Sequence, residues 1–254
     1  MALPLDPITV LLLGGAALLA GFIDAIAGGG GMLVMPALLS TGMPPHLVIG
    51  TNKLVSTFGT LSASITFIRK GLFQPRLWWA MSFGTFVGAL TGAMLVYLLS
   101  AGILKKLLPL AILGAAAYLA WPRSALKTAH SEPAPPIRRG VKLLAGGLIG
   151  FYDGFIGPGT GAFWMTAAMK LFRLDLVRAA GVARFMNFIS NFTALLTFSL
   201  FGNIDYGIGL AMGMALMVGS FIGAHSAIRY GAPFIRPVFL SVVLLMAGRL
   251  LFMG

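Results

Sequence analysis

The sequence predicts an all-α polytopic membrane protein that consists of two inverted repeats. Three observations support this fold class: the composition, the length of the apolar stretches, and an acidic, glycine-rich motif that occurs twice. Of the 254 residues, 58% are hydrophobic and only 9% are charged, with a mean hydropathy of +0.95. A soluble domain of this size has too little interior to bury so many apolar side chains, so we expect an integral membrane protein.

Apolar stretches recur along the whole chain, and most reach the roughly 20 residues that a helix needs to cross a bilayer. They lack the alternation of polar and apolar residues that is typical of a transmembrane β-strand. The expected segments are 8–27, 32–40, 47–68, 77–99, 103–121, 141–156, 162–171, 179–201, 208–228 and 234–253. The two shortest, 32–40 and 162–171, are expected to be half-helices or steeply placed short spans. The chain is therefore predicted to have about eight to ten membrane segments.

The acidic motif opens each half of the chain. Residues 21–31 read GFIDAIAGGGG, and residues 150–161 read GFYDGFIGPGTG. In both copies an aspartate, Asp24 or Asp153, lies in an apolar segment and is followed by glycines that disfavour a straight helix. A duplicated half that contains a broken helix and a buried charge is typical of membrane transporters.

The hydrophilic segment 122–140 separates the two copies. It predicts three parts: a first transmembrane repeat, 1–121, the linker itself, and a second transmembrane repeat, 141–254. Each repeat is expected to contain a broken or short helix pair followed by three transmembrane helices. The chain is thus predicted to form one membrane unit with internal symmetry.

Loop charges predict the orientation of the repeats. The loop after the broken pair is basic in the second half, at 170–178, whereas the next loop is basic in the first half, at 69–76. Because basic loops stay in the cytoplasm, equivalent loops are predicted to lie on opposite sides of the membrane, which makes the repeats inverted. The linker is then cytoplasmic and both termini are periplasmic or extracellular. Only the basic pair at 105–106 does not fit.

Asp24 and Asp153 occupy equivalent positions inside apolar segments. A charge there costs several kcal/mol unless it is paired, solvated or protonated. One interpretation is a functional carboxylate, either a protonatable group that couples transport to protons or a cation ligand. The other is a cap that accepts hydrogen bonds from the glycine-rich break or the following short helix. The two roles are compatible, and the sequence leaves both open.

The glycine clusters are predicted to supply bare N–H groups at the N-termini of the short helices, where the positive end of the helix dipole attracts an anion. These substrate-binding candidates are Gly28, Gly29, Gly30, Gly31, Gly157, Gly159 and Gly161. Irregular backbone persists within a membrane only where it lines a cavity or is buried in protein. The alternative role of these glycines is a close helix crossing. Two further G-x-x-x-G spacings, at 88–92 and 219–223, predict close helix packing.

A polar stripe with a cation at its start is the third feature that both halves share. The stripes are Lys53, Ser56 and Thr60 in the first half and Arg184, Asn187 and Asn191 in the second. Spacings of three and four place each set on one helix face. A cation followed by neutral hydrogen-bonding side chains favours a path for a small oxyanion. Snorkelling of the basic side chains to the headgroups is the alternative, but it does not explain the polar residues beyond them.

Several function classes are disfavoured. The net charge of +12 comes from basic residues in short loops between spans, which indicates membrane orientation rather than nucleic-acid binding. The chain has no cysteine and no histidine pair with ligand spacing, so we expect no metal and no cofactor. An intramembrane aspartyl protease is a weaker alternative because Asp24 lacks the G-x-G-D signature, and we expect no enzyme. A passive anion channel stays open, since a pore needs the same polar path.

The doubled G-F-x-D-x-x-x-G-x-G motif, the basic residue in the next long helix and the linker resemble the TauE/SafE family of membrane permeases, also called the sulfite exporter or TSUP family. The resemblance covers nearly the whole chain. It implies a multi-pass permease of the bacterial inner membrane that moves sulfite, a sulfonate or another sulfur-containing organic anion. Pro158 interrupts the second glycine cluster, so the two loops need not contribute equally. Together with the residues above, it predicts a proton-coupled secondary transporter that works by alternating access.

Overall fold

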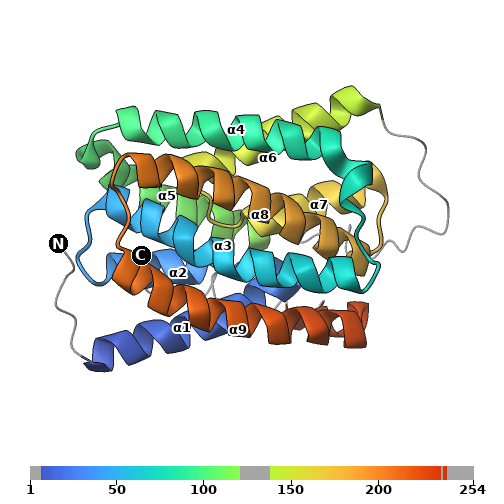
Figure 1. Ribbon diagram of the computed structural model, residues 1–254, viewed down its shortest axis with the longest axis horizontal. Helices are drawn as coiled ribbons and strands as arrows, with labels where there is room; N and C mark the ends of the chain where they lie inside the picture. The colour runs from blue at the N-terminus through green and yellow to red at the C-terminus, as the bar shows by residue number, and fades with distance from the viewer. Residues whose placement is uncertain (1–6, 121–137, 236, 239–254) are drawn as a thin grey trace.

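All regular elements in the described part of the chain are helices, which confirms the all-α prediction. The computed structural model describes residues 7–120, 138–235 and 237–238 (Figure 1). The helices are α1 (Pro7–Ala27), α2 (Gly31–Leu39), α3 (Pro45–Arg69), the 3₁₀ helix η1 (Pro75–Trp78), α4 (Trp79–Leu98), α5 (Ala101–Ala120), α6 (Arg139–Phe155), α7 (Thr160–Phe172), α8 (Leu176–Leu200) and α9 (Tyr206–Tyr230). Most of the predicted linker and of the predicted segment 234–253 lies outside the described residues.

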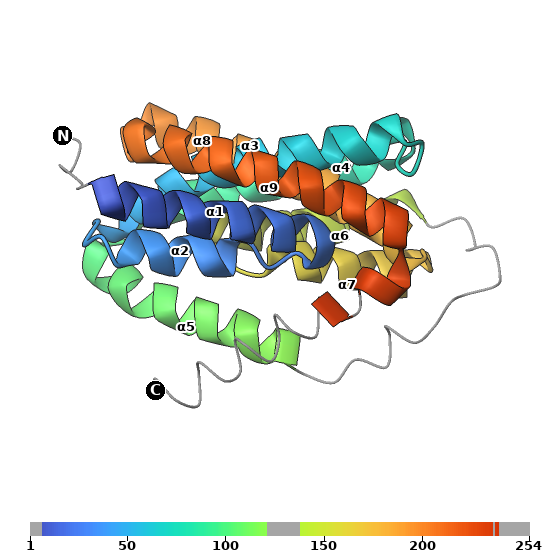
Figure 2. The same ribbon diagram turned by 90° about the horizontal axis from the view of Figure 1, so that it is seen from below.

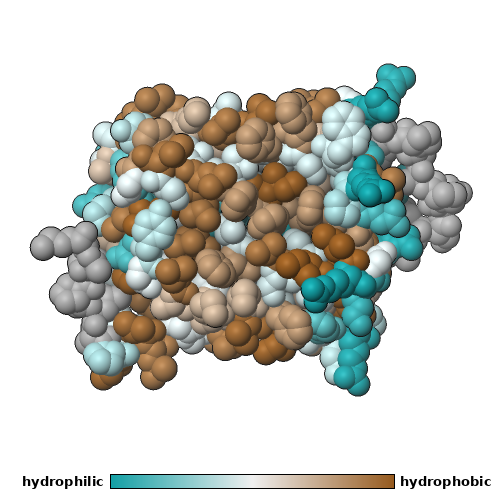
Figure 3. Space-filling model, viewed as in Figure 1, coloured by the Kyte–Doolittle hydropathy of each residue, from teal (hydrophilic) through white to brown (hydrophobic). Residues whose placement is uncertain are grey.

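The surface of the helix bundle is suited to lipid. Apolar side chains cover most of the face shown in Figure 3, and large ones such as Leu11, Phe83 and Phe221 are more than half exposed. In the described part of the chain, four helices are long and apolar enough to cross a membrane: α1, η1 with α4, α5, and α9. The protein is therefore a membrane protein, as the composition predicted.

The glycine motif reverses the direction of the chain in each half. After α1 the chain turns, and the 9-residue α2 runs back beside α1; α6 and the 13-residue α7 are arranged in the same way (Figures 1 and 2). The turns need glycine because Gly28 and Gly157 have φ angles of +85° and +91°, which side chains rarely tolerate. Each predicted broken pair is thus a hairpin of one long and one short helix.

The two halves are packed through helices that have equivalent positions in the sequence. α1 packs against α9, α4 packs against α6, and α3 crosses the middle of the bundle beside α8. In Figure 1, α3 and α8 run in opposite directions, as do α1 and α6. Each of these contacts joins one half of the chain to the other, so the interior of the bundle is the interface between the halves.

Close helix crossings occur at the predicted G-x-x-x-G positions. A Cβ atom at Gly88 would lie 2.1 Å from the carbonyl oxygen of Gly147, and one at Gly219 would lie 2.0 Å from the carbonyl oxygen of Leu18. No side chain fits at such distances, so these glycines bring the backbones of α4 and α6, and of α1 and α9, into contact. The prediction of close packing at these positions is confirmed.

Basic residues gather at one end of the bundle, where α3, α7 and α9 end and α4, α6 and α8 begin (Figures 1 and 3). They are Arg69, Lys70, Arg76, Arg138, Arg139, Lys142, Lys170, Arg173, Arg178 and Arg229. Lys142 joins two helix starts, because its Nζ donates a hydrogen bond of 3.1 Å to the carbonyl oxygen of Leu77. This basic end is the side that the orientation rule assigns to the cytoplasm.

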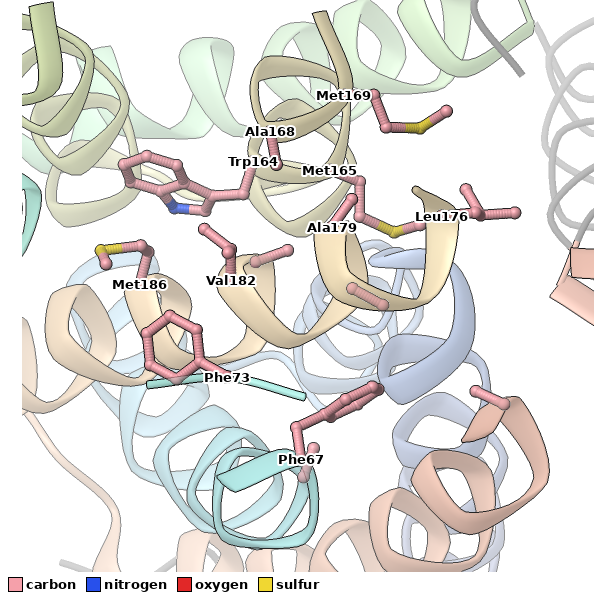
Figure 4. Close-up of a cluster of buried hydrophobic side chains, with 14 of the residues drawn as sticks. Phe67, Phe73, Trp164, Met165, Ala168, Met169, Leu176, Ala179, Val182 and Met186 are labelled. Atoms are coloured by element: carbon pink, nitrogen blue, oxygen red, sulfur yellow. The ribbon is translucent and has the colours of Figure 1, made fainter. Parts of the chain in front are cut away.

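A hydrophobic cluster near the basic end holds the short helix α7 in place. Figure 4 shows Trp164 and Met165 of α7 against Val182 and Met186 of α8, with Phe73 on the far side of α8. All of these side chains are buried. The cluster stabilises the contact between α7 and the first half of α8, and so determines how the second polar stripe faces the second glycine turn.

Candidate functional site

A small cavity lies where the two chain reversals meet. Its walls come from both halves and consist of Asp24, Gly28, Gly30, Gly31, Asn52, Ser56, Asp153, Gly157, Gly159, Thr160, Gly161, Asn187, Asn191 and Leu216. The space open to the centre of a water molecule is about 20 Å³, which suffices for about one water molecule. The N-termini of α2 and α7 both border this space.

Most of the predicted site residues line this cavity, including both aspartates, three residues of the polar stripes and all the candidate glycines except Gly29. Thr60 does not line the cavity. Its hydroxyl donates a hydrogen bond of 2.7 Å to the carbonyl oxygen of Ser56, one turn back in the same helix. Lys53 and Arg184 do not line it either. Both side chains are fully buried in protein, which excludes snorkelling to the headgroups.

Lys53 is paired with Asp153 of the other half. Its Nζ lies 2.8 Å from Oδ1 of Asp153 and also donates to the Asp153 carbonyl oxygen. Three neutral donors complete the shell of this carboxylate: the Thr160 hydroxyl at 3.2 Å from Oδ1, the Ser190 hydroxyl at Oδ2, and the Asn191 amide at 3.3 Å from Oδ2. Each Asp153 oxygen thus has two side-chain donor groups beside it, although the Thr160 hydroxyl, which has one proton, also lies 2.6 Å from the carbonyl oxygen of Gly157.

Arg184 is paired with Asp24 in the equivalent way. Its Nη1 lies 2.8 Å from Oδ2 of Asp24 and also donates to the Asp24 carbonyl oxygen. Oδ1 of Asp24 accepts a hydrogen bond of 3.0 Å from the backbone N–H of Gly30, as a cap at the start of α2 does. Nε and Nη2 of Arg184 are buried and have no hydrogen-bond partner.

The two ion pairs connect the halves of the chain and explain how four charges persist inside a membrane protein. Lys53 on α3 reaches Asp153 on α6, and Arg184 on α8 reaches Asp24 on α1. Without a partner, each of these buried charges would cost several kcal/mol. The sequence identified all four residues but assigned the cations to a substrate rather than to the aspartates.

Three polar residues of the site escaped the sequence analysis: Asn52, Thr160 and Ser190. Asn52 lines the cavity with an Oδ1 atom that has no partner, and the other two bond to Asp153. One signal for the pairing was available, because apolar helices that contain two cations and two aspartates at equivalent depths need charge compensation. Asn52 and Ser190 carried no such signal, since a neutral polar residue in a helix has many possible roles.

Comparison with known proteins assigns the chain to a family. The sequence profile of the family described as "Sulfite exporter TauE/SafE" matches residues 13–250, almost the entire chain. The chain belongs to the TauE/SafE family. The protein is therefore a membrane transporter, which agrees with its apolar surface and its buried charges.

Several bacterial relatives of this TauE/SafE protein are named as probable membrane transporter proteins. One from Sinorhizobium, ORF9, is 38% identical over 93% of this chain and 90% of its own length. One from Haemophilus influenzae is 37% identical over 92% of this chain and 91% of its own length. YfcA from Escherichia coli K12 is 37% identical over 93% of this chain and 87% of its own length. No solved structure matches the chain significantly.

The geometry of this TauE/SafE site suits the handling of both protons and anions. The cavity is bordered by two carboxylates, and each is paired with a cation that lies behind it. The starts of α2 and α7 add the positive ends of two helix dipoles. All of these groups converge on a space that has room for about one water molecule.

Proposed function

We propose that this protein is a proton-coupled secondary transporter for a small, sulfur-containing anion such as sulfite or a sulfonate. The observation that carries the proposal is the cluster of two cations and two carboxylates at the point where both chain reversals meet. Charged groups inside a membrane protein mark ion and substrate pathways. The substrate class rests on the family description and on the preference of buried cations for oxyanions.

Alternating access is the transport mode that fits the size of the cavity. About 20 Å³ is too little for sulfite, which has four non-hydrogen atoms, so an anion can enter only after the walls move apart. The Arg184–Asp24 pair joins α8 and α1, which belong to different halves and would move relative to one another in such a motion. A rocking motion of one repeat against the other around a central site is the usual way in which duplicated transporters open.

The protein is proposed to consist of two inverted repeats, 1–121 and 141–254, joined by the cytoplasmic linker 122–140 in a bacterial inner membrane. The gathering of basic residues at one end of the bundle supports this orientation, as do the opposite directions of α3 and α8. Lys105 and Lys106, at the start of α5, lie at the other end. A reporter fused to the C-terminus should be active on the periplasmic side; cytoplasmic activity would contradict the inverted arrangement.

Flux measurements in liposomes test the transport function. We expect the purified protein to move sulfite, thiosulfate, sulfoacetate or taurine, and to accumulate at least one of them when a pH gradient is imposed. Protein-free liposomes and the variant Arg184→Met are the controls. Absence of flux for all four anions would remove the substrate assignment.

The same measurement distinguishes a carrier from a passive anion channel. A channel would equilibrate the anion without accumulating it against its gradient and would depend on voltage rather than on the proton gradient. An aspartyl protease is disfavoured by the geometry, because Asp24 and Asp153 each bond to a cation of the other half. Such a pair does not share a proton as a protease dyad does.

A further inference from the structure

The two ion pairs are related by the repeat, but their surroundings differ. Building on the proposed function, we infer that Asp24 is the proton acceptor and that Arg184 holds the substrate anion once Asp24 is protonated. Lys53 and Asp153 form a permanent pair that connects the halves. The two sites are thus unequal, one exchanging its partner during transport and the other keeping it.

The hydrogen-bond shell of Asp153 contains more donors than that of Asp24. Its Oδ1 accepts from Lys53 and Thr160, and its Oδ2 accepts from Ser190 and Asn191. A protonated Asp153 would need a hydroxyl of this shell to turn from donor to acceptor and would lose its charge interaction with Lys53. The Asp153 side chain is only 2% exposed. These contacts favour a carboxylate that stays ionised and paired throughout the cycle.

Asp24 is held by fewer groups and is more open to water. Its side-chain oxygens accept one bond from Arg184 and one from the Gly30 backbone. Both aspartates border the cavity, but the Asp24 side chain is 9% exposed and that of Asp153 only 2%. A proton carried by water in the cavity can therefore reach Asp24 without removing a neutral donor.

The sequence accounts for this difference between the aspartates. The three neutral donors to Asp153 are Thr160, Ser190 and Asn191; the equivalent residues in the first half are Gly31, Gly59 and Thr60. Two of these are glycines, which have no side-chain donor. The Thr60 hydroxyl donates to a carbonyl oxygen of its own helix. The first half therefore lacks the groups that would hold Asp24 as Asp153 is held.

Arg184 has the donors that an oxyanion needs. Its Nε and Nη2 are buried without a partner, while its Nη1 bonds to Asp24. A guanidinium presents its N–H groups in a planar fork that matches two oxygens of a sulfonate or sulfite. Glycine leaves room for this fork, because a Cβ atom at Gly28 or Gly161 would lie 2.9 or 2.5 Å from Nη2.

Charge balance links the anion to the proton. The two cations and two carboxylates of the site add up to no net charge. A monovalent anion that enters alone would leave one negative charge uncompensated in a poorly hydrated interior, which is costly. In the proposed step a proton binds to Oδ2 of Asp24, Nη1 of Arg184 releases that oxygen, and Nη1 then donates to the anion. One proton accompanies each monovalent anion.

Few other titratable groups face Asp24 from the helices around it. Arg184 on α8 is in direct contact, and Lys53 on α3 and Asp153 on α6 form the other pair of the cluster. α2 has no titratable residue. Those of α7 and α9 lie in or near the terminal turns of these helices. Arg184 is therefore the charged side chain in direct contact with the Asp24 carboxylate.

Infrared spectroscopy in lipid tests the proton acceptor without any substrate. On acidification, the carbonyl band of a protonated carboxyl should appear in the wild type and be missing from the difference spectrum of Asp24→Asn. Asp205→Asn, which changes a helix cap at the start of α9, is the matched control and should keep the band. The double variant Lys53→Met/Asp153→Asn removes the other pair without leaving an unpaired charge and should also keep it. Loss of the band in the double variant but not in Asp24→Asn would overturn the assignment.

Calorimetric binding of ethanesulfonate tests the exchange, because this anion keeps its charge across the accessible pH range. Comparing buffers with different ionisation enthalpies counts the protons taken up. We expect one proton per anion in the wild type, so that affinity falls tenfold per pH unit above the point where Asp24 ionises. Asp24→Asn should take up no proton and bind with an affinity independent of pH. Proton uptake by Asp24→Asn equal to that of the wild type would refute the exchange.

The two experiments separate this inference from the proposed function. An infrared band that depends on Asp24, together with no binding of ethanesulfonate or sulfite, would leave Asp24 as the proton acceptor and refute the sulfur-anion substrate. Binding of ethanesulfonate without proton uptake would support the substrate class and refute the assignment of Asp24.

Discussion

The Lys53–Asp153 and Arg184–Asp24 pairs have the same origin in the repeat but differ in how completely their hydrogen bonds are satisfied. Each cation lies about 12 Å from the start of its helix, at about 1.5 Å per residue, and each is fully buried. Lys53 donates to two oxygens of Asp153, and that carboxylate has three further donor groups beside it, whereas Arg184 keeps two buried nitrogens without partners. The two charge pairs lie at equivalent sequence positions, but the residues around them differ, and of the two cations only Arg184 has buried nitrogens without a partner.

Removing Lys53 should have the largest effect on stability. In Lys53→Met the buried Asp153 carboxylate loses its charge partner, so we expect about 3 to 5 kcal/mol less free energy of unfolding. Arg184→Met should cost less, because the Asp24 side chain is more exposed than that of Asp153, at 9% against 2%, and keeps its hydrogen bond from the Gly30 backbone. Unfolding in mixed micelles measures both. Adding Asp153→Asn to Lys53→Met should restore part of the loss, and equal losses for the two single variants would contradict the difference between the sites.

Replacing the glycine at the first chain reversal, Gly28, should have the next largest effect on stability. In Gly28→Ala the new Cβ would lie 2.3 Å from the backbone of Gly161 at a φ angle of +85°, and we expect a loss of about 2 to 3 kcal/mol. Gly31→Ala is the matched control, since its nearest neighbour would be 4.0 Å away. The same unfolding measurement, together with flux in liposomes, compares them. A stable and active Gly28→Ala would show that the two reversals are not held in contact during transport.

Ser190→Ala addresses the neutral donors around Asp153. Removing a hydroxyl that donates to a buried carboxylate should cost about 1.5 kcal/mol. Ser64→Ala removes a buried hydroxyl that bonds only to the carbonyl oxygen of Thr60 in its own helix, and should be nearly neutral. If both variants have the same stability, the shell around Asp153 does not explain the difference between the pairs.

Asn52→Ala should have the smallest effect on stability. The Oδ1 atom of Asn52 has no partner, and the equivalent residue in the second half is Ala183, so we expect a change within about 0.5 kcal/mol. Because Asn52 borders the cavity, the KM for the transported anion should nevertheless change. A large loss of stability with an unaltered KM would give Asn52 a structural role instead.

The sequence was sufficient for the helices and for the members of the charge cluster. Helix positions follow from the length of apolar stretches. The aspartates of the cluster were recognised because a charge in such a stretch is energetically costly unless it is paired, solvated or protonated. The same reasoning did not reveal Asn52 or Ser190, whose polarity is ordinary for a helix. It also placed Thr60 at the cavity, although a threonine hydroxyl can bond within its own helix.

Local patterns thus determined the membrane class, the repeat and the four charged residues, since each of these is encoded in neighbouring residues or in a repeated motif. Only the tertiary structure decided which charges are paired. Lys53 and Asp153 are 100 residues apart and Arg184 and Asp24 are 160 apart, and they meet because the two helix hairpins turn back at the same place. The strength of a charge interaction depends on distance and burial in space, which the order of residues along the chain does not specify.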